Sequence, residues 1–267
     1  MRRALSCYWA VAVAGVHANL QYRAAAALSV FSAALACALQ VFLWHAVYAE
    51  ADRLPGIALN SLTTYVVVAQ LLGLLHANKV DDVVSGEVYR GDIAVSLLRP
   101  VSYAATCMAT HLPSAVVTAA LAGIPVLIVF ALLTTMRIPT PLDLILFAVA
   151  TMLGMLLAFE LNFLVGLAAF LTTNTWGIRM IKNAGVAFLA GQVVPLDLLP
   201  EQVASVVRLL PFQGLVDGPL RLLTGSYDGA ADVLVILSTS AAWVLVLLAL
   251  GRLAWRAALG RIEVLGG

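Results

Sequence analysis

The sequence predicts an all-α polytopic membrane protein, with six transmembrane helices in a single domain that covers residues 1–267. Three observations support this: 63% of the residues are hydrophobic, only 11% are charged, and the mean hydropathy is +1.00. A helix needs about 20 apolar residues to cross the hydrocarbon core. Six stretches approach or exceed that length, so we expect spans at residues 24–48, 59–77, 104–134, 142–171, 176–194 and 230–253.

Residues 1–23 precede the first predicted span and contain a short apolar run after two arginines. A cleaved signal peptide is one interpretation, but the run is interrupted by polar residues and leads directly into a full span. Tyr8, Trp9 and Tyr22 have amphipathic rings of the kind that settle at lipid headgroups. We therefore expect an interfacial helix on the membrane surface.

A charged segment at residues 78–100 separates two spans that carry almost no charge. A segment with this many charges is too costly to place in hydrocarbon, so it is expected to form a loop on a membrane face. Ser85-Gly86 predicts a break, followed by a short helix at residues 87–98 that ends at Arg99-Pro100. This helix would present Glu87, Arg90 and Asp92 to a partner. The alternative is a solvated loop that only joins two spans.

The distribution of basic residues predicts the orientation in the membrane. Four arginines fall on one face, namely Arg53, Arg137, Arg208 and Arg221. The other face carries Arg2, Arg3, Arg23, Lys79, Arg90, Arg99, Arg179, Lys182, Arg252, Arg256 and Arg261. Both termini and the charged segment are therefore expected in the cytoplasm, with the protein in the inner membrane. The preference for Arg over Lys indicates a bacterial source with a GC-rich genome.

Residues 195–227 form a long connection between the fifth and sixth predicted spans, and Pro and Gly interrupt it repeatedly. Apolar residues recur at helical spacing between these interruptions. We expect short extracellular half-helices that re-enter the outer leaflet. An ordinary external loop is the alternative, although its apolar content would be costly in water.

Polar residues inside the predicted spans are candidates for a functional pathway. Glu160 and Lys182 lie at similar depths in neighbouring spans, so we predict an ion pair, which either locks two helices together or lines a substrate route. Asn162 and Asn183 would complete its hydrogen bonds. Weaker candidates for the same route are Gln70, Asn174 and Gln192.

Several kinds of chemistry lack their motifs. Neither lysine follows a glycine, which excludes a Gly-Lys-Ser/Thr phosphate-binding loop, and no GxGxxG turn is present. The four histidines are scattered without metal-ligand spacing. There is no basic run for nucleic acid. We therefore expect no nucleic-acid partner, no cofactor, no metal site and no enzymatic activity in this chain.

Several short motifs follow one another along the chain, at residues 44–48, 62–65, 85–86, 89–94, 97–100, 191–196, 199–200, 210–212, 218–219 and 261–267. Their order and spacing resemble type-2 ABC transporter permeases, the membrane subunits of ATP-binding-cassette exporters. The resemblance extends over nearly the whole chain, and the entry to the fifth span, at residues 176–179, departs from it.

The resemblance implies that the short helix is a coupling helix that docks onto a separate ATPase. Two ATPase subunits and two permeases, identical or homologous, would drive ATP-dependent efflux of a hydrophobic or amphipathic substrate. The residues implied at the ATPase contact are Asp81, Asp82, Ser85, Gly86, Glu87, Tyr89, Arg90, Gly91 and Asp92. The main alternative is a stand-alone membrane scaffold or sensor. An intramembrane enzyme is a third, for which no polar catalytic cluster can be assembled.

Overall fold

The computed structural model describes residues 2–20, 23–50, 58–98 and 101–260, and these contain helices but no strand. The prediction of an all-α polytopic membrane protein is confirmed. The α-helices are α1 (Arg2–Leu20), α2 (Arg23–Glu50), α3 (Leu59–His76), α4 (Val80–Arg90), α5 (Ile93–Leu97), α6 (Tyr103–Leu133), α7 (Pro141–Leu167), α8 (Trp176–Leu189), α9 (Glu201–Val207), α10 (Asp217–Thr224) and α11 (Gly229–Leu259). Three short 3-10 helices are η1 (Ala168–Phe170), η2 (Leu196–Leu198) and η3 (Pro211–Gly214).

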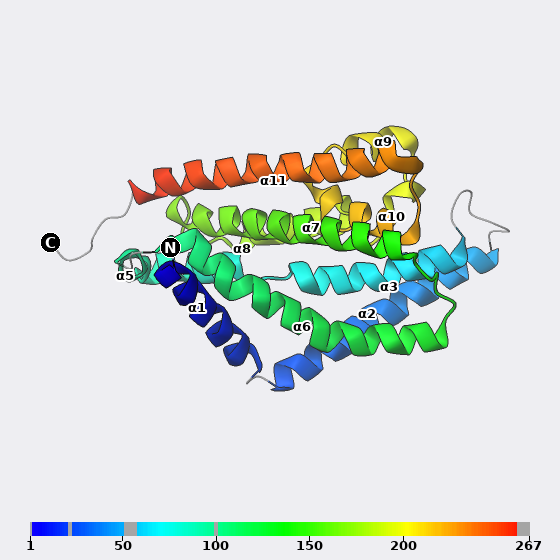
Figure 1. Cartoon of the computed structure of the whole chain (residues 1–267), viewed down its shortest axis with the longest axis horizontal. Coiled ribbons are helices and arrows are strands. Elements are labelled where there is room, and N and C mark those ends of the chain that lie inside the picture. Colours follow the sequence, from blue (N-terminus) through cyan, green and yellow to red (C-terminus); the bar gives the residue numbers. More distant parts are fainter. Residues whose placement is uncertain (1, 21–22, 51–57, 99–100, 261–267) are drawn as a thin grey trace.

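The long helices form an elongated bundle with two distinct ends (Figure 1). Helices α3, α7 and α11 follow the long axis, while α2 and α6 cross it obliquely. The start of α1, the end of α11 and helix α5 lie together at one end, which we call the α5 end. Helices α9 and α10 lie at the other, which we call the α9 end. Helix α1 therefore begins, and helix α11 ends, at the same end of the bundle.

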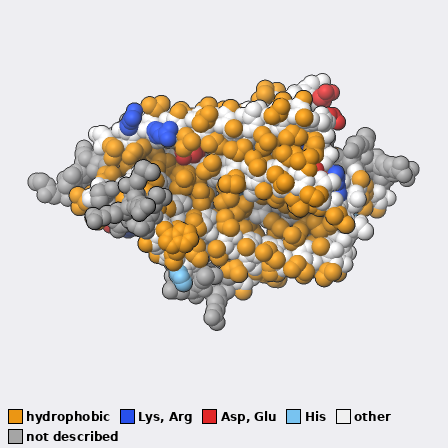
Figure 2. Space-filling view, in the orientation of Figure 1, with side chains coloured by type: hydrophobic (Ala, Val, Ile, Leu, Met, Phe, Trp, Pro, Cys, Tyr) orange, Lys and Arg blue, Asp and Glu red, His pale blue; other side chains and the backbone are white. Residues whose placement is uncertain are grey.

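Five stretches within the described residues are long and apolar enough to cross a membrane. They are Ala27–Ala49, Leu59–Arg90, Tyr103–Leu133, Pro141–Phe170 and Gly229–Leu259. Hydrophobic side chains cover most of the visible face of the bundle, and charged side chains gather toward its ends (Figure 2). This distribution is typical of a surface that contacts lipid tails.

Helix α8 is shorter than the predicted fifth span at residues 176–194. It has 14 residues and reaches about 21 Å, less than the roughly 30 Å hydrocarbon core. The chain turns just after Leu189, where Gly191 takes a φ of 81° that favours glycine. Six membrane crossings remain a prediction.

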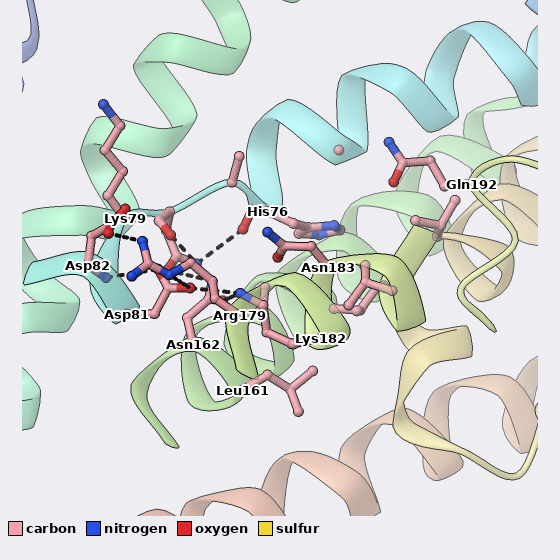
Figure 3. Close-up of a pocket in the computed structure, with 17 residues that line it drawn as sticks. His76, Lys79, Asp81, Asp82, Leu161, Asn162, Arg179, Lys182, Asn183 and Gln192 are labelled. Atoms are coloured by element: carbon pink, nitrogen blue, oxygen red, sulfur yellow. Dashed lines mark hydrogen bonds and ion pairs between the residues drawn. The ribbon is translucent and has the colours of Figure 1, made fainter. Parts of the chain in front are cut away.

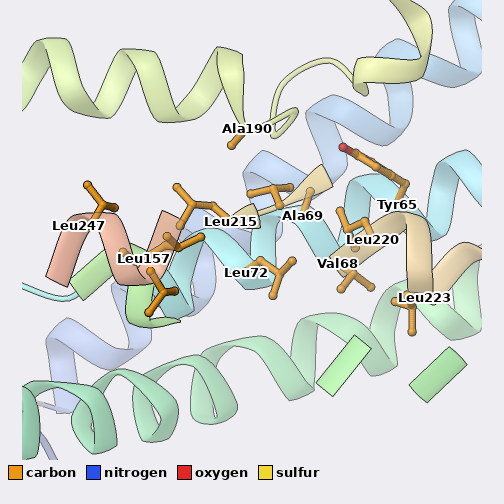
Figure 4. Packing of buried hydrophobic residues seen from close by; sticks show 13 residues of the cluster. Tyr65, Val68, Ala69, Leu72, Leu157, Ala190, Leu215, Leu220, Leu223 and Leu247 are labelled. Carbon is orange, nitrogen blue, oxygen red and sulfur yellow. The ribbon is translucent and has the colours of Figure 1, made fainter. Parts of the chain in front are cut away.

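The main core lies where α3, α7 and α11 meet the segment that follows α8 (Figure 4). Leu157, Leu215 and Leu220 are almost completely buried there. Gly154 permits the close approach of α7 to η3, because a Cβ at this position would lie 2.7 Å from the Gly214 carbonyl oxygen. Residues 195–227 thus contain η2, α9, η3 and α10, and part of this segment packs inside the bundle. Its depth in the membrane remains a prediction.

Helix α1 packs along the first half of α6. Gly15 allows this contact, since a Cβ there would lie 2.9 Å from the Thr110 carbonyl oxygen. The predicted helix in residues 1–23 is thus found over Arg2–Leu20. Its location at the lipid headgroups remains a prediction.

The predicted helix at residues 87–98, with a break at Ser85-Gly86, is wrong. Helix α4 runs through both residues, and the Ser85 hydroxyl donates to the Asp81 carbonyl oxygen (2.7 Å) within the helix instead of capping a new one. The break falls instead at Gly91, which takes a left-handed φ of 77° and ends α4. The five-residue α5 follows it.

Candidate functional site

A cluster of charged and amide side chains joins the beginning of α4 to α7 and α8 (Figure 3). We call it the inner cluster, and its members are Asn78, Asp81, Asp82, Asn162, Arg179 and Lys182. The Lys182 Nζ lies 2.9 Å from Asp81 Oδ2, and the Arg179 Nε lies 3.9 Å from the same oxygen. Arg179 also donates to Asp82. Two basic residues of α8 are thereby neutralised by two acidic residues of α4.

Two asparagines complete the hydrogen bonds of the inner cluster. The Asn162 Nδ2 donates to Asn78 Oδ1 (2.9 Å) and to the Asn78 carbonyl oxygen (3.3 Å). The Asn162 Oδ1 accepts from Lys182. Asp81 is only 5% exposed, so Lys182 and Arg179 compensate a carboxylate that has lost most of its water, and Asn162 in turn binds Lys182.

Local sequence explains why these groups share one site. Asp81 and Asp82 occupy the first turn of α4, where the helix dipole favours negative charge. Arg179 and Lys182 are three residues apart in α8 and therefore lie on the same helical face. The break between α3 and α4 at residues 77–79 places Asn78 beside α7.

The predicted Glu160–Lys182 ion pair is wrong. Lys182 binds Asp81, and Glu160 makes no ion pair within the described ranges 2–20, 23–50, 58–98 and 101–260. Glu160 and Asn162 are two residues apart in α7, so they project about 200° apart around the helix. Glu160 faces α11 instead, where a Cβ on Gly251 would lie 2.7 Å from its carboxylate. Matching depths along two helices cannot show which faces meet.

A cavity of about 380 Å³ lies beside the inner cluster. Beyond the cluster itself, its lining includes Gly73, His76, Ala77, Lys79, Ala158, Leu161, Asn183, Val186, Gln192, Leu215 and Val216. Asn162, Asn183 and Gln192 are thus brought together, as the pathway hypothesis requires. Gln70 does not line this cavity, and Asn174 serves another role, since its Oδ1 accepts the Trp176 N–H (2.8 Å) at the start of α8.

The far end of α4 and α5 form an exposed surface, which we call the α4–α5 tip. It comprises Tyr89, Arg90, Gly91, Asp92, Val95 and Leu98. The Arg90 Nε donates to Asp92 Oδ2 (2.8 Å) on this surface, and both side chains are more than half exposed. Leu98 is 84% exposed although it is apolar. An exposed apolar group beside a charged pair is typical of a protein contact.

The remaining residues of the predicted ATPase contact do not belong to this tip. Glu87 Oε2 accepts from the Tyr103 hydroxyl (2.9 Å) and the Ser96 hydroxyl (3.2 Å), so this carboxylate holds α4 to α5 and α6. Ser85 is buried, and Gly86 packs under the guanidinium of Arg90. Asp81 and Asp82 belong to the inner cluster.

A second polar cluster, which sequence reasoning missed, lies at the α9 end and contains the buried residues Tyr65 and Asp217. We call it the outer cluster, and it consists of Tyr65, Asp197, Arg208 and Asp217. The Tyr65 hydroxyl lies 3.3 Å from Asp217 Oδ1 and 3.0 Å from the Gly191 carbonyl oxygen. Arg208 donates to Asp197, while its Nε lies 3.8 Å from Asp217 Oδ2.

Asp217 is completely buried. Its Oδ2 and the Arg208 Nε have no hydrogen-bond partner within the part of the chain that the structure describes. Loss of water and the nearby Asp197 raise the pKa of Asp217 to about 6. The sequence signal for the outer cluster is that Asp197, Arg208 and Asp217 are charged residues within the largely apolar connection 195–227.

The fold and these sites define a multi-pass membrane protein with a cavity of mixed polar and apolar lining between its helices. A family model described as "ABC-2 family transporter protein" matches residues 34–266. The chain belongs to this family, which confirms the resemblance to ABC transporter permeases. No curated protein matches the chain in a sequence comparison.

Proposed function

We propose that this permease forms half of the pathway of an ATP-dependent exporter and is driven by a separate ABC ATPase. The family supports the role of membrane subunit and implies an ATPase partner. The working unit would contain two ATPases and a second permease, identical or homologous. The α5 end would face the cytoplasm, where the ATPase is located.

This proposal depends on the contacts that helix α4 makes at its two ends. One end of the helix carries the exposed α4–α5 tip, and its other end carries Asp81 and Asp82, which bind α8. The middle of the helix packs on α7, and a Cβ on Gly166 would lie 2.7 Å from the Val84 Cβ. A docked ATPase that shifts the tip would therefore move the start of α4, and with it α8.

This linkage suggests how ATP could change access to the cavity. The cavity lies between α3, α4, α7 and α8, so displacement of α8 would alter its size and its opening. ATP binding would close the ATPase pair and move both tips, which switches the bundle between two arrangements. The substrate would be a hydrophobic or amphipathic molecule.

The experiment is co-purification of the permease with its ABC ATPase in lipid nanodiscs. Leu98→Asp places a charge on the α4–α5 tip, and we expect it to release the ATPase. The control is Ile138→Asp, because Ile138 is 90% exposed on the connection between α6 and α7 at the opposite end. If no ATPase binds the native chain, or if both variants behave alike, the proposal fails and a stand-alone scaffold is favoured.

A further inference from the structure

We infer that the cavity beside the inner cluster selects amphipathic molecules whose polar group is uncharged. This inference rests on the proposed transport function and specifies its substrate class. It depends on three properties of the lining: neutralised charges, two unbonded amides and an apolar wall.

The charges that line the cavity neutralise one another. Lys182 is paired with Asp81, and Arg179 is paired with Asp82. Lys79 also borders the cavity, but its side chain extends away from the other lining residues (Figure 3). An anionic ligand would have to separate the two basic residues from their aspartates, and a cationic ligand would have to displace one of them. Either event leaves a poorly hydrated charge without its partner.

Uncharged hydrogen-bonding groups remain for a ligand, namely the amides of Asn183 and Gln192 and the His76 Nε2, which has no partner among the described residues. The side-chain amides of Asn183 and Gln192 make no hydrogen bond with another residue in the described part of the chain. Each amide offers both donors and an acceptor. In Figure 3 the charged residues gather at one end of the cavity, Asn183 lies near its middle, and Gln192 lies at the other end. The two amides could therefore bind hydroxyl or amide groups of a ligand.

An apolar wall accompanies these amides. Leu161, Val186, Leu215 and Val216 line the same cavity, and Leu215 and Val216 are only 1% exposed. Small-molecule sites commonly combine such a wall with a few polar groups in about 300 to 1,000 Å³. The cavity volume of about 380 Å³ falls in this range. It suits a hydroxyl- or amide-bearing head with a short apolar chain.

The test uses the permease in nanodiscs without ATPase, so that binding is separated from coupling. Three photoactivatable probes share one octyl chain and differ in head group: a glucoside, a sulfate and an ammonium. Labelled peptides are identified by mass spectrometry. We expect the glucoside to label cavity residues about tenfold more than either charged probe, because its hydroxyls can pair with the two amides.

Variants show whether the amides cause the selection. The double variant Asn183→Leu with Gln192→Leu should lower glucoside labelling about tenfold. Asn183→Gln, which keeps the amide, and Gln202→Leu, which changes an exposed amide on α9, should preserve it. Size-exclusion profiles identify variants that do not fold, and Asn183→Gln then serves as the decisive comparison with Asn183→Leu alone.

A gain of binding gives a second test. Asp82→Asn leaves Arg179 with only its longer contact to Asp81, so the sulfate probe should label the cavity several-fold more than in the native chain. Equal labelling by charged and uncharged probes, or full labelling in the Asn183/Gln192 double variant, would overturn the inference. Loss of ATPase binding in the co-purification experiment would instead affect only the proposed function.

Discussion

The inner and outer clusters each contain a buried aspartate, Asp81 and Asp217, but they differ in how completely that charge is paired. Asp81 in the inner cluster has Lys182 at 2.9 Å and Arg179 at 3.9 Å. Asp217 in the outer cluster has Arg208 only at 3.8 Å, and one of its oxygens lacks a hydrogen bond within the described residues. The comparison indicates that the inner cluster is a firm link between helices. The outer cluster is a site at which protonation can change stability.

The largest expected effect is removal of the closest cation from the inner cluster. Lys182→Ala leaves Asp81 buried beside the more distant Arg179, which should lower the free energy of unfolding by about 3 kcal/mol. Thermal unfolding in detergent measures the change. Lys79→Ala is the control, because Lys79 is exposed and makes no ion pair with another described residue. A similar loss in both variants would show that the inner cluster is not a firm link.

A matched double variant sharpens this prediction. Asp81→Leu combined with Lys182→Met removes both charges, so no uncompensated carboxylate remains. Its unfolding temperature should recover most of the loss caused by Lys182→Ala. The single variants Asp81→Leu and Lys182→Met complete the comparison. If their effects on stability simply add in the double variant, Asp81 and Lys182 do not interact.

The outer cluster should make stability depend on pH. The pKa of Asp217 is about 6 in the folded protein, against an ordinary value of 3.8. The folded protein therefore holds a proton that the unfolded chain releases, so stability should fall by about 3 kcal/mol as pH rises from below 4 to above 6. Unfolding measured over this range should show the decline. Asp217→Asn should reduce its slope, and an unchanged slope would contradict this assignment.

Gly191→Ala should disturb the outer cluster without changing any charge. The residue has a φ of 81°, and a Cβ would lie 2.6 Å from the Tyr65 hydroxyl. We expect the free energy of unfolding to fall by about 1–3 kcal/mol. Gly177→Ala in α8 is the control, because a Cβ there meets nothing within 4 Å. Equal unfolding temperatures for the two variants would contradict the close packing around Tyr65.

The smallest expected effect is loss of one hydroxyl from the outer cluster. Tyr65→Phe removes the group that reaches Gly191 and Asp217, which should cost about 1 kcal/mol. Tyr89→Phe, a change of the same kind on the exposed α4–α5 tip, should leave the unfolding temperature unchanged. A neutral result at Tyr65 would mean that its hydroxyl does not stabilise the outer cluster.

Sequence patterns predicted the helical class and most of the long helices because apolar runs record membrane length directly. The location of the charged segment outside the hydrocarbon remains a prediction, because the span-length stretch Leu59–Arg90 includes its first half. The position of the helix break in this segment could not be predicted, because Ser85-Gly86 and Gly91 both resemble helix ends in sequence. Only the observed φ of Gly91 distinguishes them.

Partners across the bundle could not be predicted from spacing. Asp81 and Lys182 are 101 residues apart, and the assignment of Lys182 to Glu160 considered depth but not helical face. The outer cluster brings Tyr65 to Asp217, which is 152 residues away. Such contacts depend on how helices rotate against each other, and the spacing of residues along the chain does not specify that rotation.

The central claim is that α4 and α8 move as one unit when the ATPase binds nucleotide. It is tested by spin-label distances in nanodiscs containing the complex, after replacement of the three native cysteines. Labels at Tyr89→Cys, Ile181→Cys and Leu253→Cys occupy exposed positions on α4, α8 and α11. With a non-hydrolysable ATP analogue, the Tyr89–Ile181 distance should stay constant while the Ile181–Leu253 distance changes. A changed Tyr89–Ile181 distance with α8 fixed against α11 would contradict the linkage.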